Sequence, residues 1–392
     1  MSQYIQDTLR NNLKSIVKTC TVPQQKAVHE VVRGLFLKHT PILRHLAQHP
    51  KHTVKKQAEK YAYHLGHIEL TPQVEKHALR QIKSSLTNDT IIAYDLTDIA
   101  KESAQCMEKL SRVFDGSKRK PTNGYTLHGV GVHDMLLKFE VHDGAAQTLS
   151  QVRRRVVEEL SSEFEKQGIW VFDRGNDHKS FFVSLRHELN VRFVARIKEN
   201  RHVVVKETGE KCAVKCLAPG KYEVYLMNRY NTHVDTRCTY TLIISKHLED
   251  KEPIRLLSSL PLQQYTEQEF VTIYLERWGV ESSFRRAKQK FQLERIRVRS
   301  YQKFINLVAL IQFAVNVSRM MFLALQKTTS TLVVGVILFY KRFIRLKNLT
   351  FTTDSFISYL GEHLTPLLRR KTPPPLQLSL LSWRQLGKLG SS

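Results

Sequence analysis

Acidic residues are scarce in this chain of 392 residues. Asp and Glu number 36 against 61 Lys and Arg, which leaves a formal net charge of +25. A compact fold with such an excess repels itself unless a polyanion is its usual partner. Nucleic acid is the commonest such partner, and an anionic membrane surface is the second.

Cysteines and long apolar runs are also few. The five cysteines are odd in number and scattered, which excludes a disulfide framework and favours a reducing compartment. The polar N-terminus, MSQYIQDTLR, leads us to expect no export signal. The apolar stretch from Phe304 to Ser318 ends at Arg319. It is shorter than the roughly 20 residues that a membrane span needs, so we expect a buried helix.

Several chemistries lack their motifs here. The chain contains no P-loop, no GxGxxG sequence and no nucleophile elbow, so use of ATP or a dinucleotide is unsupported. Cys212, Cys216, His233 and Cys238 could be interpreted as a zinc site. Their spacing fits no common zinc finger, and the cysteines fall in strand-like runs, so we do not expect a zinc site there.

The hydrophobic pattern divides the chain into segments. Residues 1–88 have apolar residues at helical spacing and a basic run at 51–56, which favours a helical DNA-binding domain. A solvated helical bundle that only packs on the rest of the chain is the alternative. Residues 89–199 change to strand patterns in the order β-β-β-α-β-α-β, which predicts an α/β fold with a mixed sheet flanked by helices.

The remaining segments follow the same reasoning. Residues 200–265 contain short strand-like runs separated by turns and are predicted to be a β-rich insertion. Residues 266–325 return to helix and complete the core. Residues 326–392 are predicted to be a basic, helical C-terminal tail, broken by the prolines at 373–375.

Two aspartates follow apolar strands directly. Asp95 ends the run IIAY, and Asp173 ends IWVF, so a buried sheet would deliver both carboxylates to its rim. An Asp at a strand end is usually a turn or cap residue, and Asp98 and Asp177 are nearby competitors. Two-metal phosphoryl chemistry needs such clustered carboxylates, and Asp95 and Asp173 are preferred because each directly follows its strand.

A third carboxylate, Glu281, stands on a predicted helix. Tyr274, Arg277, Glu281 and Lys288 share one stripe of that helix, which Trp278 and Arg285 extend, beside an apolar stripe that can pack on a sheet. A solvated face with ion pairs such as Arg277–Glu281 is the alternative. Together with the strand-end aspartates, the stripe favours a catalytic face in which the cations and rings bind DNA.

These residues resemble a known family. The spacing Tyr274-x2-Arg277-x3-Glu281-x6-Lys288 is similar to the YREK signature of bacterial insertion-sequence transposases with an RNase H-like DDE catalytic domain. YDLTDIAK, VFDRG and FVARIKENR add matches, and the resemblance covers roughly residues 20–325. It implies that Asp95, Asp173 and Glu281 hold two Mg²⁺ ions, for which Mn²⁺ can substitute.

The resemblance also implies partners and a location. Such enzymes bind the terminal inverted repeats of their element and target DNA, work as dimers in a synaptic complex, and act on the bacterial nucleoid in the cytoplasm. Some relatives stack a flipped base on a Trp from the insertion, but residues 200–265 contain none. Four tyrosines are the possible substitutes there: Tyr222, Tyr225, Tyr230 and Tyr240. A non-catalytic DNA-binding relative and an RNase H-like nuclease or resolvase are the rival functions.

Overall fold

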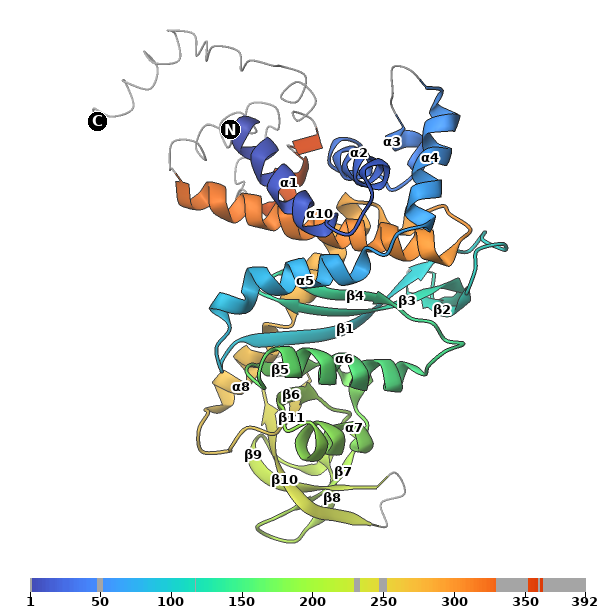
Figure 1. The fold of residues 1–392 in the computed structure, drawn as a ribbon. Helices are drawn as coiled ribbons and strands as arrows, with labels where there is room; N and C mark the ends of the chain where they lie inside the picture. The colour runs from blue at the N-terminus through green and yellow to red at the C-terminus, as the bar shows by residue number, and fades with distance from the viewer. Residues whose placement is uncertain are drawn as a thin grey trace, which may run out of the picture.

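A long mixed sheet with helices on both faces forms the centre of the protein (Figure 1). The computed structural model describes residues 2–47, 52–116, 118–228, 233–246, 252–328, 352–358 and 360–361. The mixed α/β fold predicted from the sequence is confirmed in these residues.

Five helices precede the sheet, as the helical pattern of residues 1–88 predicts. They are α1 (Ser2–Ile16), α2 (Val22–Lys38), α3 (Leu43–Leu46), α4 (Val54–Gly66) and α5 (Thr71–Ile82), which a 3₁₀ turn follows. Thr21 and Gln24 form a capping box that begins α2, and Thr53 accepts a hydrogen bond from the backbone of Lys56 to begin α4. The apolar faces of these helices pack on α10 (Tyr301–Thr328).

The first half of the sheet carries the predicted catalytic segments. Its strands are β1 (Ile91–Ala100), β2 (Ser111–Asp115), β3 (Lys120–Val132), β4 (Met135–Val141), β5 (Ile169–Phe172) and β6 (Arg192–Arg196). The strand β2 was not predicted. Strand β1 pairs with β3 antiparallel and with β5 parallel, and β5 pairs with β6 parallel. Helices α6 (Leu149–Glu163) and α7 (Lys179–Val183) make the connections to β5 and β6.

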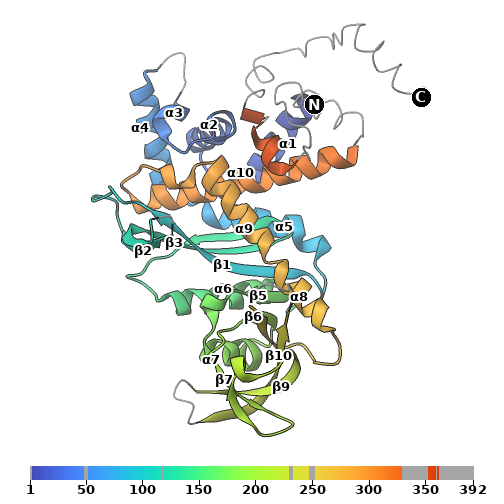
Figure 2. The same cartoon turned by 180° about the vertical axis from the view of Figure 1, so that it is seen from behind.

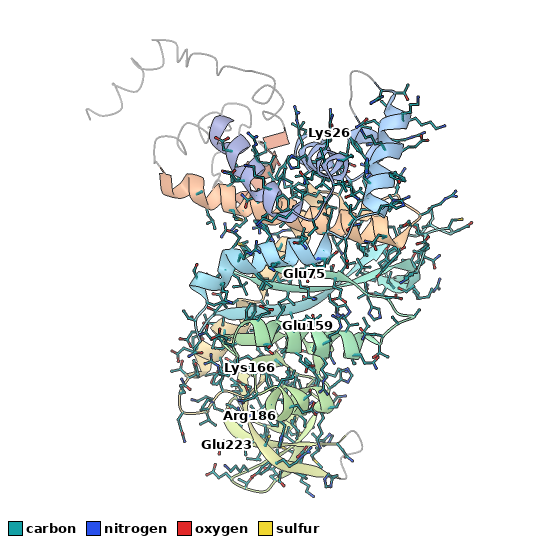
Figure 3. All side chains as sticks on the ribbon, viewed as in Figure 1. Lys26, Glu75, Glu159, Lys166, Arg186 and Glu223 are labelled. Carbon is teal, nitrogen blue, oxygen red and sulfur yellow. The ribbon has the colours of Figure 1, made fainter. Side chains whose placement is uncertain are left out.

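The β-rich segment continues this sheet. It contains β7 (His202–Val205), β8 (Lys211–Ala213), β9 (Gly220–Met227), β10 (Val234–Ser245) and β11 (Ile254–Ser258). Because β11 pairs antiparallel with β6, the strand order runs β2-β3-β1-β5-β6-β11-β10-β9-β7-β8, with β4 beside β3. The far strands form the end of the molecule opposite the N-terminal helices, where Figure 3 labels Glu223 at one end and Lys26 at the other.

The helical stripe around Glu281 is not one continuous helix. Helix α8 (Glu267–Leu275) ends before Glu276, α9 (Trp278–Arg285) begins after Arg277, and a π-helical turn covers Arg286–Lys290. At the junction, the backbone N–H of Arg277 donates to the Tyr274 carbonyl and that of Val280 donates to the Arg277 carbonyl, each three residues back as in a 3₁₀ turn. The single helical stripe predicted for Tyr274 to Lys288 is therefore interrupted at this junction. Figure 2 shows α9 crossing β1 between α10 and α8.

Three apolar clusters hold the layers together. One joins α1–α5, α9 and α10 to one face of β1, β3 and β4. A second fills the opposite face beneath α6 and α7, and a third packs α8 on β5, β6, β10 and β11. The long helix α10 is apolar enough, by length and composition, to cross a membrane, but 78% of its apolar window is buried inside the protein. The prediction of a buried helix is confirmed.

Candidate active site

The sheet places Asp95 and Asp173 next to each other. The last parallel pair between β1 and β5 joins Tyr94 to Phe172, and each aspartate is the next residue along its chain. Strand β5 ends there, whereas β1 continues and pairs Asp95 with Gly129 of β3. The two carboxylates therefore stand where one strand of a buried pair stops, as the sequence predicts.

Side-chain alternation distinguishes Asp95 from its competitor Asp98. Ala93 and Ile99 belong to the apolar cluster on the α9 face, so Asp95 lies on that face too. Asp98 falls on the opposite face with Tyr94, and its carboxylate accepts a hydrogen bond from Thr126 Oγ1 at 2.6 Å. Only Asp95 of the two faces Glu281.

Two glycines let α9 approach this face, and the sequence analysis overlooked them. Gly129 and Gly131 lie opposite Asp95 and Ala93 on β3. A Cβ on Gly129 would stand 2.2 Å from the ring of Phe284, and one on Gly131 would stand 3.1 Å from Val280. The alternating pattern Gly-Val-Gly within a strand was the available signal, because glycine in a strand often marks a close approach.

The YREK residues meet the aspartates through a buried arginine. Arg277 Nη1 lies 2.7 Å from Asp95 Oδ2 and 2.6 Å from Glu281 Oε1. The Tyr274 hydroxyl donates to Asp173 Oδ1 at 3.2 Å, and the guanidinium of Arg277 lies 5.7 Å from the centre of the Tyr274 ring. The structure thus brings together three carboxylates, one cation and one phenol.

Burial and neighbouring charges alter the acidity of these groups. Burial raises the pKa of Asp95 to about 6, and the negative charges of Asp173 and Glu281 add to the rise. The Arg277 cation and the Leu96 N–H act in the opposite direction. Burial opposes the charge on Arg277, but the carboxylates raise its pKa above the ordinary value. Asp95 therefore relies on a nearby cation to stay ionised at neutral pH.

The donor set suits a hard divalent cation. Carboxylate oxygens are the ligands that Mg²⁺ prefers, and here two of them already converge on one positively charged nitrogen. Within the described residues no group of three His, Cys, Asp or Glu side chains is arranged around a common metal position. The carboxylate ligands fit Mg²⁺ or Mn²⁺, but the Arg277 guanidinium occupies the space between Asp95 and Glu281.

The other residues of the stripe lie farther from the carboxylates. Lys288 donates to the backbone carbonyl of Asp98 at 2.7 Å and lies 3.6 Å from Glu294. Trp278 is 62% exposed and so does not pack beneath the cations. Arg285 is also exposed. Trp278 and Arg285 are thus open to solvent, whereas Lys288 already has partners in the protein.

A buried network supports the loop after Asp173. Asp177, the second competitor, accepts hydrogen bonds from the Lys198 backbone at 2.8 Å and from Arg201 Nε at 2.5 Å. Asn176 donates to the carbonyl of Asp173 and accepts from the buried Arg153 at 2.8 Å. Asp177 is thus a structural acid. The sequence offered one hint of this network, an arginine at 153 beside the apolar stripe of α6.

A basic hollow of about 760 Å³ opens beside this loop. Lys179, Lys198 and Arg201 line it together with His178 and His202. Of the insertion tyrosines proposed as base-stacking residues, Tyr240 is buried and Tyr222 donates to the Ala218 carbonyl at 2.8 Å. Tyr225 is partly exposed, and Tyr230 lies outside the described residues.

Comparison with known families identifies the chain. Residues 86–317, which include all three carboxylates and the YREK stripe, match the family model described as "Transposase DDE domain". The chain belongs to this transposase family. No curated protein matches it. Among solved structures it is similar to the piggyBac transposase in a synaptic complex with hairpin DNA, with 13% identity and a TM-score of 0.44. The similarity covers 92% of this chain and 75% of that one.

Proposed function

We propose that this transposase cuts and joins DNA at the ends of a bacterial insertion sequence, with Asp95, Asp173 and Glu281 as its catalytic carboxylates. The convergence of Asp95 and Glu281 on one cationic nitrogen, with Asp173 on the next strand, is the observation that carries the proposal. The strand order β4-β3-β1-β5-β6, with β1, β5 and β6 parallel, supports an RNase H-like core.

The chemistry proposed is in-line attack on phosphodiesters. Bound Mg²⁺ would supply Lewis acidity at the attacking and leaving oxygens. Water first attacks the phosphorus at the element end, and the broken P–O bond leaves a free 3′-OH. That 3′-OH then attacks a target phosphodiester, which forms the new bond as the target's own 3′ oxygen leaves. Each step exchanges one P–O bond for another, so no covalent enzyme intermediate and no oxidant are needed.

The exposed members of the stripe are proposed to position the DNA. Trp278 and Arg285 stand on the open side of the carboxylates, where a ring can stack on a base or sugar and a guanidinium can bind a phosphate. Lys288 has a backbone partner in the free protein, so it would exchange that bond for a phosphate. The basic hollow beside the loop after Asp173 is proposed as a second cationic surface for DNA.

We assign recognition of the terminal inverted repeats to the N-terminal helices. We also propose that two copies of the chain form a dimer in the synaptic complex. Action on the nucleoid in the bacterial cytoplasm is part of the same proposal. The net charge of +25 supports a polyanionic partner for the whole chain.

Strand transfer in vitro tests the proposal. Purified protein, Mg²⁺ and a duplex carrying the ends of the element that surrounds the gene should yield cleaved 3′ ends and joined products. Asp95→Asn, Asp173→Asn and Glu281→Gln should each abolish both products, whereas Asp98→Asn should retain them. A protein that binds the ends but never cuts would be the non-catalytic relative, and one that cuts without joining would be a nuclease.

A further inference from the structure

The three carboxylates of the free protein do not surround an empty position. Arg277 Nη1 bridges Asp95 Oδ2 and Glu281 Oε1, so one protein cation stands between two of the proposed metal ligands. The guanidinium balances the negative charges of both carboxylates. A divalent cation that approaches the same oxygens is therefore repelled by the positive charge of Arg277.

The hydrogen-bond donors of Arg277 are only partly used. The Arg277 side chain is 9% exposed, and among the described residues its buried Nε has no hydrogen-bond partner. A buried donor without a partner costs free energy. A phosphate group offers two oxygens in the geometry that a guanidinium prefers, so it can engage donors that Asp95 and Glu281 leave unused.

The backbone around Arg277 suits such a movement. Arg277 stands at the junction between α8 and α9, outside the regular bonding of either helix. Tyr274 binds Asp173 independently through its hydroxyl, so Asp173 keeps a partner when the guanidinium leaves. The exposed Glu281 carboxylate can turn toward an incoming ion without breaking a helix.

We infer that Arg277 is a placeholder cation that keeps the metal site closed until DNA arrives. This inference rests on the proposed function of the three carboxylates. When a DNA phosphate draws the guanidinium away, Asp95 and Glu281 become free for the divalent ion. DNA binding and metal binding are then coupled, and metal-dependent cleavage is confined to protein that already holds DNA.

Metal binding, measured without any reaction, tests the inference. Free Mn²⁺ is followed by electron paramagnetic resonance in titrations of wild type, Arg277→Met and Arg295→Met. Arg295 is an exposed arginine that bonds Gln292, so its loss is a matched change of charge. We expect Arg277→Met to bind Mn²⁺ at least about tenfold tighter without DNA, because a repelling charge is removed, and Arg295→Met to match wild type.

A DNA arm then tests the coupling. A short duplex of arbitrary sequence should tighten Mn²⁺ binding by wild type and leave Arg277→Met unchanged, with Asp95→Asn as the blank for ions taken up by the DNA itself. Equal Mn²⁺ affinity of wild type and Arg277→Met without DNA would overturn the inference, as would the absence of a DNA effect on wild type.

Two further measurements distinguish a failure of the placeholder role from a failure of the proposed function. If Arg277→Met is unstable without metal, Mn²⁺ should raise its melting temperature by more than it raises that of wild type, and an equal or smaller rise contradicts the placeholder role. If Asp95→Asn binds Mn²⁺ as well as wild type does in the presence of the duplex, the proposed function itself fails. If Asp95→Asn loses Mn²⁺ binding there while Arg277→Met binds Mn²⁺ no tighter than wild type without DNA, only the placeholder role fails.

Discussion

At the scale of single residues, four aspartates near two strand ends divide into two roles. Asp95 lies on the face of the sheet that α9 covers and Asp173 accepts a hydrogen bond from Tyr274 of α8, whereas Asp98 points to the other side of the sheet and Asp177 is enclosed by its partners. The sequence favoured Asp95 and Asp173 because a residue directly after a buried strand stays at the rim of the sheet, and their catalytic role stays a prediction. It could not show what the competitors do, since their partners come from distant segments.

These roles predict opposite effects of two similar substitutions. Asp177→Asn should lower the free energy of unfolding by about 3 kcal/mol, because it leaves Arg201 beside a neutral group in a nearly buried pair. Asp98→Asn should change it by less than about 1 kcal/mol, since an amide oxygen can still accept from Thr126. Urea unfolding of both variants measures this, and a larger loss for Asp98→Asn would reverse our assignment.

At the scale of elements, the hydrophobic patterns predicted most strands and helices but not their joints. The runs IIAY and IWVF are continuous and apolar because β1 and β5 are buried on both faces. The break between α8 and α9 escaped prediction because its residues are ordinary helix formers. The contact of Arg277 with Asp95, 182 residues away in the sequence, accompanies the break there, and no local pattern reports such a long-range contact.

The glycines of β3 give a test of how α9 is positioned. Gly129→Ala would place a methyl group against the Phe284 ring, so α9 must shift away from β1 and carry Glu281 with it. We expect a loss of about 1–3 kcal/mol in unfolding free energy from overpacking, and a fall in strand transfer beyond the loss of folded protein.

A matched change on the same strand is the control for this test. Gly124 also contacts β1 closely but lies away from α9, so Gly124→Ala should cost stability without a fall in activity per folded molecule. Equal activity losses in the two variants would show that the effect is not specific to α9.

A buried histidine joins two of the N-terminal helices and makes their stability depend on pH. His77 of α5 bonds Ser15 of α1 at 2.9 Å and lies against the Phe313 ring of α10. Burial, with the positive charge of Arg80, lowers the pKa of His77 from 6.5 to about 4. Between these values the unfolded chain binds more protons, so the contribution is full above pH 6.5 and is lost as the pH falls toward 4.

The variant His77→Gln isolates this effect. Its unfolding free energy should lack up to about 3 kcal/mol of the decrease that wild type shows over that range. The pH dependence of the variant's unfolding free energy must be subtracted from that of wild type. Burial raises the pKa of Glu75 to about 7, which changes the stability of both proteins with pH in the opposite direction. Chemical unfolding at several pH values measures the difference, and parallel curves would exclude His77 as the cause.

At the scale of the whole molecule, the N-terminal helices are both the proposed DNA-binding surface and part of the apolar core. The N-terminal helices share one apolar cluster with α10 and the sheet, so deleting residues 1–88 would expose much of α10. A truncated protein would therefore test folding as much as DNA recognition. Charge substitutions on the outer faces of these helices leave that cluster intact and are the cleaner experiment.

Helix α4 presents such a face. Lys56, Lys60 and Tyr63 are exposed along one stripe, opposite the buried Tyr61 and Leu65. If this stripe binds DNA, Lys56→Gln with Lys60→Gln should lower the slope of log K against log salt by about two units, one for each lost phosphate contact. End recognition predicts in addition a larger loss of affinity for the element ends than for a scrambled duplex.

The matched control removes the same charge elsewhere. Lys83 and Lys166 are exposed near the amino ends of β1 and β5, on the side of the sheet away from the carboxylates. Their double substitution by Gln should leave the slope within about half a unit of wild type, because cations that touch no phosphate release no counterions. If both double variants lower the slope equally, the protein binds DNA through diffuse charge. In that case α4 has no special part in recognising the ends, and the N-terminal helices serve mainly to cover α10.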